Sequence, residues 1–188
     1  ISFATRLDNL QNQNRLLTGQ VEELTNAIRQ EKRSTRELYT SIDERLGKFE
    51  PREVEVNGEK VMVQPQEQAA YDAAVELLKA GDYKKAAAAF STFGAEWPKS
   101  AYAADAVYWR GSCLFALEQY KSTINVQNSL IRSYPKHPRV ADAMISVASS
   151  QAALGNVKAA SATLAKVIKQ YPNSDAAKTA AQLQKTLK

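Results

Sequence analysis

Few side chains of this 188-residue chain could carry out chemistry. The one histidine, His137, lies between Lys136 and Pro138 without a Cys, His or acidic residue beside it in the sequence, so we expect it to be solvent-exposed rather than a ligand or a base. The one cysteine, Cys113, precedes Leu114 on an apolar helical face. We expect it to be a small core residue, with a reactive thiol as the alternative, and a single cysteine forms no internal disulfide.

Several functional classes are therefore disfavoured. The sequence has no Ser/His/Asp set, no glycine-rich phosphate loop and no paired acids in a pocket-like context, so we expect no enzyme, cofactor or metal. No apolar run reaches the ~18 residues of a transmembrane helix. Dispersed lysines without a recognition motif argue against nucleic acid. Residues 67–188 carry 15 basic and 9 acidic side chains, which form either an ordinary solvated surface or a surface for an acidic partner.

The remaining candidate site is a groove for a partner protein. Helical repeats curve, and the first helix of each unit usually lines the concave face. For Tyr71 and Tyr108, packing between repeats is an equal alternative to partner binding. The predicted groove residues are Gln68, Tyr71, Val75, Asp105, Tyr108, Ser112, Phe115, Asp142, Ile145 and Ser149.

A repeat of 37 residues positions these side chains. Pro98, Pro135 and Pro172 each follow an aromatic residue, and the prolines are 135 − 98 = 37 and 172 − 135 = 37 residues apart. The same step relates Ala74 to Gly111 and Ala148, where small residues would let antiparallel helices approach closely. Apolar residues follow helical spacing within each unit, and proline ends it. This helix–turn–helix order resembles the tetratricopeptide repeat.

The N-terminal residues 1–49 predict a long coiled-coil helix. Apolar residues recur in alternating steps of three and four, which is typical of an oligomerisation seam. Val or Ile beside Leu, with a buried Asn14, would favour two strands, whereas residues 6–11 resemble a trimer-favouring pattern with Gln11 where Glu is usual. We expect a homo-oligomer, a trimer rather than a dimer. The seam residues are Leu7, Leu10, Asn14, Leu17, Val21, Leu24, Ile28, Leu38 and Ile42.

Residues 50–66 join the two parts. Alternating valines flank Asn57-Gly58, which predicts a β-hairpin with Val54 opposite Val61, although an extended linker is equally compatible. The fold class is thus all-α, with a coiled-coil helix followed by an α-solenoid. The solenoid would contain three tetratricopeptide-like hairpins, at about 67–103, 104–140 and 141–173, and a capping helix at 174–188.

Over nearly its whole length, the chain resembles one family. The stretches GQVEELTNAIRQ, AYDAAVELLKAGDYKKAAAAF and WPKSAYAADAVYWRGSCLFALEQY are similar to the periplasmic Tol-Pal-associated cell division coordinator family, called YbgF or CpoB. The chain departs from it at Thr123, at residues 128–130 and in the hairpin-like junction.

The resemblance implies a non-enzymatic periplasmic adaptor. It would bind TolA and a bifunctional peptidoglycan synthase, and coordinate peptidoglycan synthesis with outer-membrane constriction during cell division. The chain starts at Ile1 without a leader, so we expect that an export signal has been removed. The alternatives are a repeat scaffold in outer-membrane protein assembly and a co-chaperone.

Overall fold

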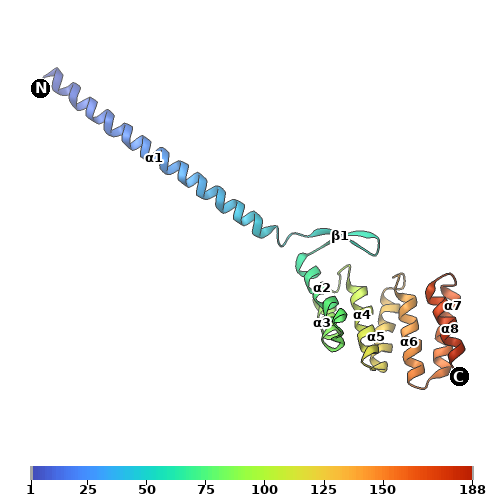
Figure 1. The fold of residues 1–188 in the computed structure, drawn as a ribbon. Helices are drawn as coiled ribbons and strands as arrows, with labels where there is room; N and C mark the ends of the chain where they lie inside the picture. Colours follow the sequence, from blue (N-terminus) through green and yellow to red (C-terminus); the bar gives the residue numbers. More distant parts are fainter. Residues whose placement is uncertain (1, 188) are drawn as a thin grey trace. The chain divides into compact units, whose positions relative to one another are not determined.

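The computed structural model describes residues 2–187, and the chain divides into two units, residues 1–50 and 51–188. The first unit is essentially one helix, α1 (Phe3–Leu46), which Figure 1 shows unbroken. None of its residues is buried, and seam residues such as Leu10, Val21 and Leu24 are 60–64% exposed. An apolar stripe of this length facing water is unfavourable, so α1 presents a surface for other helices.

The second unit begins with a β-hairpin. Strand β1 (Arg52–Val56) pairs antiparallel with β2 (Glu59–Val63), with Val54 opposite Val61 and Glu55 opposite Lys60. Asn57 and Gly58 both have positive φ, as the tight turn requires. Of the two alternatives for this junction, the structure therefore contains the hairpin.

Three helical pairs follow in sequence order (Figure 1). They are α2 (Pro65–Lys79) with α3 (Tyr83–Glu96), α4 (Ala103–Ala116) with α5 (Tyr120–Ser133), and α6 (Val140–Ala153) with α7 (Val157–Gln170). Each helix packs on the next one, and α4 also contacts α6. Helix α8 (Asp175–Thr186) is capped by the preceding residue Ser174, whose Oγ accepts a hydrogen bond from the Ala177 N–H, as predicted for this helix start.

The 37-residue step is visible in the core. Four sets of residues related by this step are all buried. The buried sets are Ala74, Gly111 and Ala148; Ala86, Thr123 and Ala160; Phe90, Gln127 and Leu164; and Phe93, Leu130 and Val167.

Position 111 shows why this part of the core needs a small residue. A small residue was predicted there so that the paired helices could pack closely. The side chain of Gln127, from the paired helix α5, occupies the space beside Gly111, and a Cβ at position 111 would overlap the amide group of Gln127. Glycine is needed there because a polar side chain has to fit.

Candidate partner-binding surface

The predicted groove residues lie on α2, α4 and α6, the first helix of each pair. Asp142 and Phe115 are exposed, whereas Gln68, Val75, Ser112 and Ser149 are half-buried. These six side chains are at least partly accessible from solvent. The groove remains a prediction for them.

The aromatic groove positions form contacts between successive repeats. The ring of Tyr71 stacks on Tyr102, with centroids 4.4 Å apart and an interplanar angle of 11°. One repeat later, the guanidinium of Arg139 lies 4.9 Å from the ring centroid of Tyr108. Positions 102 and 139 are themselves 37 residues apart, so the same inter-repeat contact is made by a tyrosine pair and by a cation–π pair. Burial raises the pKa of both Tyr71 and Tyr108, in keeping with this packing role.

Asp105 is the most enclosed of the predicted groove residues. Its carboxylate accepts a hydrogen bond from Asn57 Nδ2 at 2.9 Å and another from Arg139 Nε at 2.9 Å. The side chain is 7% exposed, so these bonds compensate for the loss of water around a buried charge. Asn57 lies in the hairpin turn, Asp105 lies in α4, and Arg139 directly precedes α6. We call Asn57, Asp105, His137 and Arg139 the hairpin cluster.

The expectation for His137 was wrong. Its side chain is 11% exposed, and Nε2 lies 3.5 Å from Asp105 Oδ2 and 3.1 Å from Asn57 Nδ2. The acidic neighbour is 32 residues away in the sequence and the amide 80 residues away, so inspection of the local sequence could not reveal either. The cluster connects the hairpin turn to α4 and to the loop between α5 and α6, and β-strand residues Val56 and Val63 are also buried.

The chemistry available in the repeats is limited. Burial raises the pKa of the Cys113 thiol to about 11, which keeps the thiol protonated and unreactive near neutral pH. Among residues 2–187, no group of three or more His, Cys, Asp or Glu residues is arranged to hold a metal ion. No described helix is long and apolar enough to cross a membrane.

A hollow lies elsewhere, between α5 and α7, with α6 at its base. Its volume is about 590 Å³. The apolar lining residues are Ile131, Pro135, Val140, Met144, Val147 and Tyr171. The polar lining residues are Asn128, Gln151, Thr163, Lys166 and Gln170. Sequence reasoning missed this hollow because it assigned binding to the first helix of each pair, whereas most of the rim comes from the second helices.

Two family models match adjacent parts of the chain. Residues 1–55 match the family described as TolA binding protein trimerisation, and residues 63–188 match the family YfiO, described as outer membrane lipoprotein. Among curated proteins, the cell division coordinator CpoB of Pseudomonas putida is 49% identical over 41 residues. That match covers 22% of this chain and 15% of the relative.

Solved structures share the repeat fold at low sequence identity. PcrH from Pseudomonas aeruginosa has a TM-score of 0.57 at 14% identity, over 68% of this chain and 95% of that one. The Yersinia enterocolitica secretion chaperone SycD, in complex with a peptide of the translocator YopD, has a TM-score of 0.57 at 16% identity, over 66% and 94%. The Arabidopsis OM64 TPR domain has a TM-score of 0.54 at 13% identity, over 64% and 94%. These likenesses show a tetratricopeptide-type fold.

Proposed function

Since the chain belongs to the YbgF/CpoB cell division coordinator family, and its residues 63–188 to the YfiO family, we propose that it is a periplasmic adaptor without enzymatic activity. It binds TolA and helps coordinate peptidoglycan synthesis with outer-membrane constriction during cell division. A bifunctional peptidoglycan synthase is its second partner.

The main support for this proposal comes from the exposed apolar seam of the first unit. Residues 1–55 match the family described as TolA binding protein trimerisation, and most of them belong to helix α1 (Phe3–Leu46), whose seam is exposed over its length. A single helix of this composition buries little apolar surface when it forms, so its stability comes from association with other copies. We expect a homotrimer in which the seams face one another, each carrying its own repeat domain.

In this proposal the two units divide the work. The seam fixes how many repeat domains are brought together, and the repeats hold segments of partner proteins. Three linked domains raise the effective concentration of binding sites, so a partner with several segments is held more tightly than by one domain. The predicted groove contributes through its accessible positions, Asp142 and Phe115 above all.

A pull-down from a cell-envelope extract tests the proposal, with the full chain as bait and TolA detected by antibody. The seam variant Leu17→Asp with Leu24→Asp places two charges in the helix interface and is expected to abolish the trimer in light-scattering measurements. The control, Asn12→Asp with Asn26→Asp, adds the same charge on the outer face of the heptads and should remain trimeric.

Each outcome has a meaning for the adaptor. Recovery of TolA by the wild type and the control supports the proposal, and its loss with the seam variant would show that binding depends on the oligomer. Absence of TolA from the wild-type eluate would contradict the adaptor function. A wild type that is monomeric at micromolar concentration would contradict the trimer.

One observation favours a second candidate. The longer family match is to an outer membrane lipoprotein family, which agrees with a repeat scaffold in outer-membrane protein assembly. Recovery of outer-membrane assembly proteins without TolA in the same pull-down would favour this function.

A further inference from the structure

The hollow between α5 and α7 combines an apolar base with polar side chains, as a binding site does. Its base consists of Val140, Met144 and Val147, which are 2–6% exposed, and half-buried Ile131 and Tyr171 line it too. A concave surface of several hundred Å³ with an apolar base and a few polar groups is typical of a binding site. Met144 adds a flexible side chain that can adapt to different apolar groups.

The polar groups of the hollow are largely unused within the protein. Thr163 Oγ1 donates to Gln151 Oε1 at 2.9 Å, which ties α7 to α6. Across the described part of the chain, the side chains of Asn128, Lys166 and Gln170 find no hydrogen-bond partner. These donors are free to bind a ligand with acceptor groups.

The helices around the hollow have a one-sided charge. From Tyr120 to Gln170 the chain has seven basic residues and one acidic residue, Asp142. The basic residues are Lys121, Arg132, Lys136, Arg139, Lys158, Lys166 and Lys169. Arg139 is paired with Asp105, whereas within residues 2–187 the other six have no carboxylate within 4.0 Å. Lys166 lines the hollow itself, and the excess of unpaired basic residues on α5, α7 and the loop before α6 gives this part of the domain a positive potential that attracts an anionic partner.

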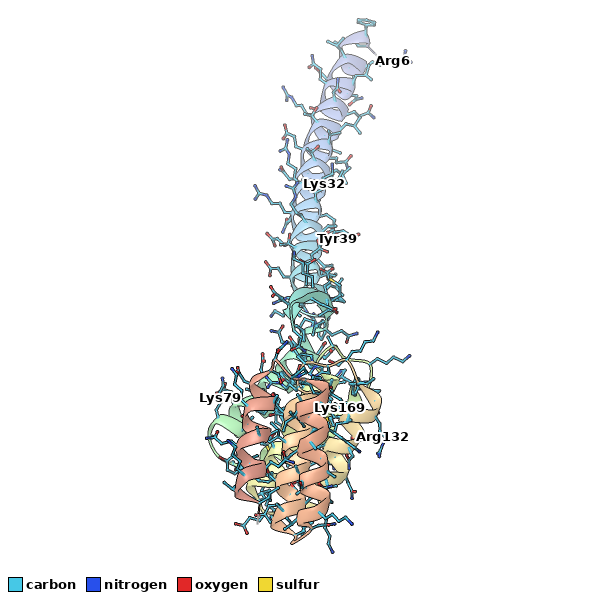
Figure 2. The ribbon with its side chains drawn as sticks, turned by 90° about the vertical axis from the view of Figure 1, so that its right-hand side faces the viewer. Arg6, Lys32, Tyr39, Lys79, Arg132 and Lys169 are labelled. Carbon is cyan, nitrogen blue, oxygen red and sulfur yellow. The ribbon has the colours of Figure 1, made fainter. Side chains whose placement is uncertain are left out.

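Two of these cations lie next to the rim. Arg132 follows the lining residue Asn128 by four positions, and Lys169 follows Lys166 by three, so each shares a helix face with a lining residue. Figure 2 shows Arg132 and Lys169 toward one side of the repeat domain and Lys79 toward the other. The charge is therefore placed where it can act on something in the hollow.

From this geometry we infer that the hollow binds an acidic segment of a partner protein, with apolar side chains on the base and carboxylates directed at Lys166 and the neighbouring cations. A nucleic acid backbone or a free phosphate would leave the apolar base unused, whereas an acidic segment with aliphatic or aromatic residues satisfies both features. This inference deepens the proposed function by giving the repeat domain a site and its partner segment a chemistry, and it rests on the adaptor function only for the partner's identity.

A library of random 16-residue peptides displayed on phage tests the inference without assuming a partner. The bait is the full chain, and selected peptides are then measured by fluorescence titration against variants. We expect enrichment of peptides that combine Asp or Glu with aliphatic or aromatic residues. Lys166→Glu and Met144→Asp should each weaken their binding at least about tenfold, because one reverses the attraction and the other charges the base. Added salt should weaken binding to the wild type.

Lys84→Glu is the matched control for Lys166→Glu. Lys84 is exposed on α3, in the first repeat, and this substitution makes the same change in net charge away from the hollow. Circular dichroism melts of every variant separate lost binding from lost folding. Since Lys166 is exposed and without an ion pair to a described residue, Lys166→Glu should melt like the wild type.

The outcomes are distinct. Acidic, apolar peptides that lose affinity for Lys166→Glu but not for Lys84→Glu would support the inference. No enrichment over a blank support, enrichment of basic peptides, or equal binding to both variants would overturn it. Concentration-dependent dimerisation through the hollow, lost in Lys166→Glu, would show that a second copy is the occupant and would also overturn it. The TolA pull-down decides the adaptor function separately.

Discussion

The second repeat differs from the first and third in the buried core between its two helices. Gln127 is buried in the second repeat at the position that Phe90 occupies in the first and Leu164 in the third. Its Nε2 donates to the carbonyl oxygen of Tyr108 at 3.2 Å, whereas its Oε1 has no partner in the described structure. A buried amide with an unsatisfied oxygen costs about 1–3 kcal/mol, so the second repeat has the less favourable core.

The turn within the second repeat is also less favourable. Gly81, Glu118 and Gly155 are 37 residues apart and all have positive φ, at 77°, 57° and 77°. Glycine adopts this backbone region readily, whereas glutamate is strained there. A repeat with neighbours on both sides is supported by two interfaces, so the middle of the array can accommodate both costs. The stability of one repeat in this domain therefore depends on the repeats that pack against it.

The largest effect is expected from moving the glutamine into the first repeat. Phe90→Gln removes a large buried ring and buries an amide beside Ala74, where no glycine makes room for it. We expect a loss of about 3–5 kcal/mol in the free energy of unfolding, measured by urea denaturation. A loss below ~1 kcal/mol would show that the first repeat tolerates the amide as well as the second does.

A smaller loss is expected from Gly111→Ala. The added methyl group overlaps the side chain of Gln127, and overpacking of this kind costs about 1–3 kcal/mol. Gly94→Ala is the matched control, because a Cβ at position 94 meets no atom within 4 Å. That control should stabilise helix α3 by about 0.5–1 kcal/mol, so opposite signs are predicted for the two substitutions. The same sign for both would contradict the proposed role of Gly111.

Replacing the buried amide of Gln127 by an apolar side chain should stabilise the protein. Gln127→Leu eliminates the unsatisfied oxygen and restores the apolar residue found in the third repeat. We expect a gain of about 1 kcal/mol in unfolding free energy, since the lost hydrogen bond to Tyr108 offsets part of the benefit. Leu164→Gln, the reverse exchange in the third repeat, should instead destabilise. A destabilised Gln127→Leu variant would show that the amide is needed for packing.

The smallest effect concerns the turn. Glu118→Gly relieves the positive φ at position 118 and should stabilise by up to about 1 kcal/mol, reduced by the greater flexibility of glycine in the unfolded chain. Gly155→Ala, the converse change one repeat later, should destabilise by a similar amount. Thermal melts of both variants decide this, and a lower melting temperature for Glu118→Gly would contradict it.

The sequence predicted the helical repeat accurately, whereas it predicted the buried hairpin cluster and the hollow poorly. The 37-residue step predicted three helical pairs, and the Asn57-Gly58 pair predicted a hairpin register that the structure contains. His137 could not be placed, because its partners Asn57 and Asp105 belong to segments far away in the chain. The hollow was missed for a similar reason, since its lining residues come from three helices whose packing brings them together.

By itself, the sequence determined the local structure of this protein. Spacing of apolar residues, glycine and proline positions, and capping residues act over a few residues, so the periods of the seam and of the repeats can be read from the chain. The burial of Asp105, the space that Gly111 leaves for Gln127 and the apolar hollow lined by Lys166 all follow from the tertiary structure. Those features depend on contacts between residues that are distant in the chain. Such contacts form only when the helices pack together.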